Sequence, residues 1–166
     1  SGLSVFRLHG QNRRFVKFLL SRISGFIDQK SGASTNFSTY FVSRSGTKPY
    51  EVEHVWADKF EEHRDEFEQR HEFENYRNRI GGLVLLPRGT NQSYGDKSYP
   101  VKLEHYLKEN LLVKSLHAKS YENNPNFLSM FKELGLPFQP HPEFAKEDID
   151  QRQILVQSIC KAIWKN

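Results

Sequence analysis

The chain is almost free of cysteine. Cys160 is its single cysteine among 166 residues. An internal disulfide and a cysteine-rich zinc site are therefore both excluded. A chain without disulfides fits a reducing compartment, so we expect a cytoplasmic protein.

Long apolar runs are also missing. No run approaches the roughly 20 apolar residues that a membrane-spanning helix needs, and the first residues lack the apolar core of a signal peptide. We therefore expect no membrane partner. The chain also lacks the Gly-x-x-x-x-Gly-Lys-Ser/Thr loop, which excludes P-loop nucleotide hydrolysis by these residues.

Aromatic and basic residues are plentiful. Thirteen Phe, seven Tyr and two Trp supply the core of one folded domain, and the net charge of +4 permits a nucleic-acid partner. Acidic residues gather in residues 58–74. Basic residues gather near the N-terminus and in the middle of the chain, at Arg7, Arg13, Arg14, Lys17 and Arg22 and at Arg77, Arg79, Arg88, Lys97 and Lys102.

The hydrophobic pattern predicts an α-rich α+β fold with one small hairpin embedded in helices. Alternation of apolar and polar residues predicts a strand over residues 50–56, and a short apolar run predicts another over 83–86. Residues 31–48 are rich in Ser, Thr and Gly and predict a connector. Apolar residues at helical spacing predict exposed helices within 58–79 and further helices at 11–29, 98–109, 111–117, 126–134 and 147–164.

Three residues near the predicted hairpin carry chemistry that suits phosphodiester hydrolysis. His54 ends the first strand, and a neutral imidazole can take a proton from water. Glu53 and Asn91 offer the oxygen ligands that Mg²⁺ prefers. Taken alone, His54 is an ordinary strand histidine and Asn91 is a turn residue. Glu51 is a rival to Glu53, because it has the same chemistry and lies on the same face of the strand.

The segment Glu-Val-Glu-His-Val-Trp-Ala, followed by Ile-Gly-Gly-Leu-Val-Leu-Leu-Pro, Asn91 and Lys102, resembles the HNH (His-Me finger) nuclease motif. It is most similar to the C-terminal nuclease domain of GmrSD-type, modification-dependent restriction enzymes. Their pattern is roughly Glu/Asp-His-Ile-x-Pro, then Ile-Gly-Asn-Leu-x-Leu-Leu, an Asn after the second strand and a Lys on the next helix. The resemblance implies a small ββα-metal core over about residues 48–107.

This resemblance implies a role for each matching residue. His54 would be the general base, while Glu53 and Asn91 would hold Mg²⁺ or Mn²⁺. Lys102 would contact a phosphate or support the site from its helix, which completes a catalytic set of His54, Asn91 and Lys102. The basic residues expected to bind nucleic acid around this core are Arg77, Arg79, Arg88, Lys97 and Lys102.

The chain departs from the family pattern at two positions. Ala57 stands where the pattern often has Pro, which affects only the exit from the strand. Gly82 stands where many members have an Asn that orients the catalytic His. We therefore expect another group to orient His54, with Tyr50, Glu51, Thr90 or a backbone carbonyl as candidates.

The sequence as a whole predicts a metal-dependent HNH endonuclease that cuts DNA as the effector of a restriction or anti-phage system. Residues 1–166 are expected to form one nuclease domain, with helical flanks at 1–47 and 108–166. We expect it to be the C-terminal part of a larger protein, with NTP-dependent DNA sensing in another domain or subunit. The alternatives are a catalytically impaired nucleic-acid-binding module with the same fold and a nuclease directed at RNA.

Two charged segments have competing interpretations. Arg13, Arg14 and Lys17 are either a stripe that faces DNA or the polar face of an amphipathic helix. His63 and His71 lie among acidic residues, but no His-Glu-x-x-His pattern accompanies them. We expect those two histidines to lie on a solvated charged surface.

Overall fold

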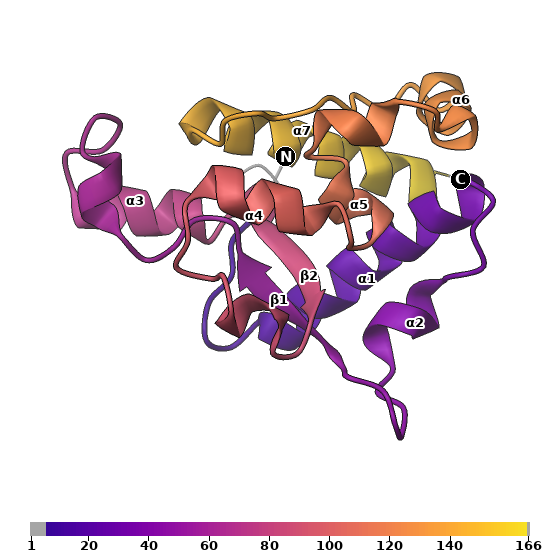
Figure 1. Ribbon diagram of the computed structural model, residues 1–166, viewed down its shortest axis with the longest axis horizontal. Helices are drawn as coiled ribbons and strands as arrows, with labels where there is room; N and C mark the ends of the chain where they lie inside the picture. Colours follow the sequence, from indigo (N-terminus) through magenta and orange to yellow (C-terminus); the bar gives the residue numbers. More distant parts are fainter. Residues whose placement is uncertain (1–5, 166) are drawn as a thin grey trace.

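The computed structural model describes residues 6–165, apart from the side chain of Asn91. Helices surround one two-stranded antiparallel sheet (Figure 1), which confirms the α+β prediction. The elements are α1 (Arg13–Lys30), α2 (Phe37–Phe41), β1 (Tyr50–His54), α3 (Arg70–Arg77), β2 (Leu83–Pro87), α4 (Tyr99–Tyr106), α5 (Leu111–Lys114), α6 (Pro125–Glu133) and α7 (Lys146–Ile163), with short 3₁₀ helices η2 (Phe60–His63), η3 (Ile80–Gly82), η4 (Thr90–Gln92) and η5 (Ala118–Tyr121).

The β1–β2 hairpin separates two hydrophobic cores. Its register pairs Val52 with Leu85 and Glu53 with Val84. Because side chains alternate across a strand, Val52 and Leu85 join the core built on α1. Val84 joins the second core, which contains Leu103 and Tyr106 of α4. The end of β1 therefore lies between two packed layers that hold it in place.

The start of β2 is fixed by a close approach of α7. A Cβ atom added at Gly81 would lie 2.6 Å from the Ile149 carbonyl oxygen and 2.8 Å from the Gln153 nitrogen. Only glycine leaves room for this contact. The glycine pair before β2 thus serves helix packing as well as entry into the strand.

Three expectations are corrected by tertiary packing. The connector over residues 31–48 contains α2, whose first turn is stabilised by a capping box between Asn36 and Thr39. The charged region 58–79 is largely exposed apart from its buried phenylalanines, but His63, expected on the solvated surface, packs against Trp56 with ring centroids 4.3 Å apart. Ile154, whose helical spacing with Leu155 and Ile159 predicts a place on the packed face of α7, is 55% exposed.

No helix in the described part of the chain is long and apolar enough to cross a bilayer.

Candidate active site at the end of the first strand

His54 is the last residue of β1, and its ring is held from the end of α3. Its Nε2 lies 2.7 Å from Oδ1 of Asn78, the residue that caps the C-terminus of α3. Asn78 Nδ2 donates to the Glu74 carbonyl oxygen at 2.8 Å, which leaves Oδ1 as the acceptor facing the ring. His54 must then donate from Nε2, so Nδ1 carries the lone pair.

Burial keeps the imidazole neutral. Desolvation, followed by the nearby charge of Arg77, lowers the pKa of His54 to about 4. Arg13 and Lys102 act in the same direction, while the hydrogen bond to Asn78 raises the pKa. At neutral pH the ring is therefore unprotonated and can accept a proton at Nδ1.

Glu53 and Lys102 lie on the other face of the strand. The Glu53 side chain projects toward α4, because adjacent residues of a strand alternate between its faces. Lys102 of α4 is 1% exposed, and its Nζ donates to the Val55 carbonyl oxygen at 2.8 Å. Burial and the charge of Arg77 lower the pKa of Lys102 to about 8, partly offset by Glu53. This geometry favours the supporting role expected for Lys102 over the phosphate contact.

The alternative ligand Glu51 pairs with Arg88. Its carboxylate accepts a hydrogen bond from Arg88 Nε at 2.7 Å, near the start of the hairpin. Glu53 is adjacent to His54 and close enough to Lys102 to influence its pKa. The structure therefore distinguishes Glu53 from Glu51, although strand alternation places both side chains on the same face.

The basic residues expected to bind nucleic acid fall into two groups. Arg77 donates from Nε to the Trp56 carbonyl oxygen, and Arg79 lies over the ring of Tyr76 and pairs with Asp150 at 3.5 Å. These two side chains and that of Lys102 thus contact other groups of the protein. The remaining two, Arg88 and Lys97, lie on the surface.

The residues near Glu53 are compatible with a hydrated divalent cation. Among residues 6–165 no three His, Cys, Asp or Glu side chains form a metal cluster, but Mg²⁺ needs only one or two carboxylates because it keeps several waters. The buried hydroxyls of Tyr94 and Tyr106 have no hydrogen-bond partner among the described residues; burial raises the pKa of both, and the charge of Glu53 adds a smaller effect in the same direction. Buried hydroxyls need partners, and metal-bound waters would supply them. The Asn91 backbone lies in η4, and its side chain is outside the described part of the chain.

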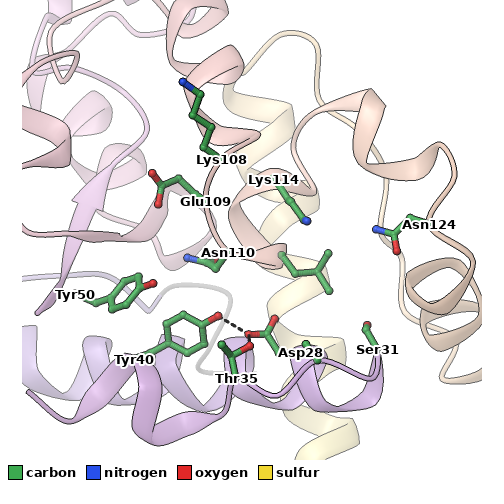
Figure 2. Close-up of a pocket in the computed structure, with 12 residues that line it drawn as sticks. Asp28, Ser31, Thr35, Tyr40, Tyr50, Lys108, Glu109, Asn110, Lys114 and Asn124 are labelled. Carbon is green, nitrogen blue, oxygen red and sulfur yellow. Dashed lines mark hydrogen bonds between the residues drawn. The ribbon is translucent and has the colours of Figure 1, made fainter. Parts of the chain in front are cut away.

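A polar hollow of about 400 Å³ lies near the other end of β1, bordered by Tyr50 (Figure 2). The Asp28 carboxylate there accepts hydrogen bonds from Thr35 at 2.6 Å and from Tyr40. Burial raises the pKa of Asp28, against the effect of both hydrogen bonds. These bonds tie the segment that contains α2 to α1, so we assign the carboxylate an architectural role.

Sequence reasoning missed Asn78 as the group that orients His54. The expected substitutes Tyr50, Glu51 and Thr90 are corrected by the observed bond to Asn78. Its position at the end of a helical segment is a recognisable signal, since Asn is common at helix ends. That signal carries no information about a contact 24 residues away.

The comparisons with known proteins identify the family. A model of the family described as GmrSD restriction endonucleases, C-terminal domain, matches residues 3–155. No match was found among curated proteins or among solved structures. The family match covers most of the chain and includes both strands and the helix that follows them. The chain therefore belongs to the family of C-terminal domains of GmrSD restriction endonucleases.

Proposed function

We propose that this chain is a metal-dependent HNH endonuclease that hydrolyses phosphodiester bonds of DNA. The observation that carries the proposal is the His54–Asn78 hydrogen bond at the end of β1. It holds a neutral imidazole in one tautomer beside the carboxylate-bearing residue Glu53. Membership in a restriction endonuclease family makes DNA the expected substrate.

In this mechanism His54 is the general base. Nδ1 accepts a proton from the water that attacks the scissile phosphate, and Asn78 Oδ1 continues to accept the hydrogen bond from Nε2. The positive charge of Arg77 and Arg13, which disfavours protonated His54, favours an anionic phosphate at the same place. Lys102 and Arg77 hold the backbone of residues 55 and 56 just after the strand.

Glu53 and Asn91 would hold a divalent cation, with Mg²⁺ and Mn²⁺ as the expected ions. When bound, such an ion neutralises charge on the phosphate and lowers the pKa of water. The Tyr94 and Tyr106 hydroxyls would accept or donate hydrogen bonds to the waters that complete the coordination. Lys102, beside Glu53, limits how much negative charge this face accumulates before the ion binds.

The proposal extends to the organisation of the protein. Residues 1–166 would act as one nuclease unit with its HNH core at about 48–107. An NTP-dependent module that senses DNA, in another domain or subunit, would direct the cutting in a restriction or anti-phage system. This division of labour is consistent with the missing P-loop in the chain itself.

The direct test is cleavage of supercoiled plasmid DNA, modified and unmodified, by the purified chain. We expect nicked or linear product with Mg²⁺ or Mn²⁺ and none in EDTA. Asn91→Ala should lower the single-turnover rate far more than DNA affinity. Full cleavage in chelator would contradict the metal mechanism, and a wild-type rate for Asn91→Ala would remove that residue from the site.

The alternative is a nucleic-acid-binding module that has lost cleavage. Gly82 favours it, because the family pattern often has an orienting Asn there. The hydrogen bond that His54 donates to Asn78 weakens this argument, because it orients the ring without an Asn at position 82. DNA binding without nicking in either metal ion would favour the alternative, and preferential cutting of an RNA competitor would redirect the proposal to RNA.

A further inference from the structure

A groove of about 510 Å³ runs between the first turns of α1 and the start of the hairpin. Four cationic side chains and only one carboxylate line it. They come from segments far apart in the sequence, α1 on one side and the β1–β2 hairpin on the other. The charged residues are Arg13, Arg14, Lys17, Arg88 and Glu51.

The cations on α1 are held in place without being neutralised. Arg14 and Lys17 lie over the ring of Phe41, at 5.0 and 5.9 Å from its centroid. Such contacts orient a cation and leave its charge available. Arg13 donates from Nη1 to the Val52 carbonyl oxygen at 3.1 Å, which fastens α1 to β1.

The positive charge in the groove is in excess. Burial, followed by the charge of Arg14, lowers the pKa of Lys17, and Arg88 acts in the same direction. Glu51 is the opposing group, and it already accepts a hydrogen bond from Arg88. A ligand with regularly spaced negative charges would relieve this repulsion.

We infer that this groove binds the sugar–phosphate backbone of the DNA strand that leads to His54. The inference rests on the proposed function and adds a binding surface to it. Val52 lines the groove, and His54 follows two residues later on the same strand. Since a strand rises about 3.3 Å per residue, the groove lies roughly 7–10 Å from His54.

The groove offers positive charge to a ligand, which most of the basic residues expected from sequence do not. Arg77, Arg79 and Lys102 are engaged with the protein itself. Arg88 is shared between the expected set and the groove. The inference assigns Arg13, Arg14 and Lys17 to a surface that faces DNA, which is the first of the two interpretations of these residues.

The test is a salt titration of DNA binding, measured by fluorescence anisotropy in EDTA so that no cleavage occurs. Lys17→Gln and Arg14→Gln should each lower the slope of log K against log salt by about 0.9 and weaken binding roughly eightfold at 0.1 M salt. Lys132→Gln on α6 and Arg22→Gln on α1 are matched controls. Arg22 lies over Phe37 as Arg14 lies over Phe41, but it does not line the groove.

A further variant should bind DNA more tightly than the wild type, a result that misfolding does not explain. Glu51→Gln removes the only carboxylate among the groove residues and frees Arg88. It should tighten DNA binding and steepen the salt dependence.

The outcomes separate this inference from the proposed function. If the wild-type chain binds and cuts DNA but Lys17→Gln and Arg14→Gln bind no worse than their controls, the groove is not the DNA-binding surface. A failure of Glu51→Gln to tighten binding would also overturn it. If the wild-type chain binds no DNA at all, the proposed function fails together with the inference.

Discussion

The strand end around His54 and the groove along α1 both gather positive charge, but they hold it in different ways. At the strand end, Lys102 and Arg77 donate to backbone carbonyl oxygens that fix their positions. In the groove, Arg14 and Lys17 lie over an aromatic ring, where Arg14 is exposed and Lys17 is partly buried. The first arrangement positions a reacting group, and the second offers charge to a ligand.

Because of this difference, the two regions should affect different quantities, one the cleavage rate and the other the affinity for DNA. A buried cation bonded to the backbone contributes through the geometry that it maintains, and its loss leaves a carbonyl oxygen without a partner. An exposed cation contributes through counterion release, which depends on salt. Substitutions at the strand end should therefore change the cleavage rate, and those in the groove should change affinity. Each prediction below tests one side of this contrast.

The largest effect is expected for His54→Ala. Loss of a general base typically costs about 10²–10⁴ in rate. DNA affinity in EDTA should stay near the wild-type value, because the groove is intact. Single-turnover cleavage and anisotropy measure the two quantities, with circular dichroism as a check on folding. Wild-type turnover in this variant would remove His54 from the mechanism.

Asn78→Ala should have the next largest effect. Residues that orient a functional group commonly contribute about 10–100-fold. The loss should fall on the rate at saturating DNA, because the imidazole is no longer held in the tautomer with a free Nδ1. Asn75→Ala is a matched control on the same helix, since its amide oxygen accepts from Arg79 and not from His54. Equal losses in the two variants would reduce Asn78 to a structural role.

Lys102→Met should lower the cleavage rate by roughly tenfold without changing the salt dependence of binding. The buried ammonium holds the Val55 carbonyl oxygen and does not meet solvent. Lys97→Ala, an exposed neighbour in sequence, is expected to do the reverse if it contacts DNA, with a slope lowered by about 0.9. A lower salt slope for Lys102→Met would show that this lysine reaches a phosphate after all.

The smallest effect concerns pH. The pKa of His54 lies at about 4 in the folded chain, below its ordinary value of 6.5. The unfolded chain therefore binds the proton first as pH falls. Stability from this group is complete above about pH 6.5 and is lost as pH falls toward 4. An NMR titration of the metal-free chain should give a His54 midpoint near 4, and Arg13→Gln should raise it slightly. A midpoint near 6.5 would contradict the burial of the ring.

Local patterns predicted much of this fold. The alternation of residues 50–56 correctly predicted β1, because a half-buried strand repeats every two residues. The short apolar run before Pro87 correctly predicted β2, because that strand is buried on both faces. The periodicity of residues 11–29 correctly predicted α1. The failures have the same origin. His63 lies in a charged segment without long apolar periodicity, so its packing against Trp56 depended on a contact that no local pattern encodes.

The sequence by itself determined the family, the hairpin and the order of Glu53, His54 and Asn91 along the chain. Only the tertiary structure decided that Asn78 holds His54, that Lys102 is buried and that Glu51 pairs with Arg88. The physical reason is that periodicity reports which face of an element is apolar. It does not report which distant side chain meets that element. The groove between α1 and the hairpin exists for the same reason, because only folding brings those charges together.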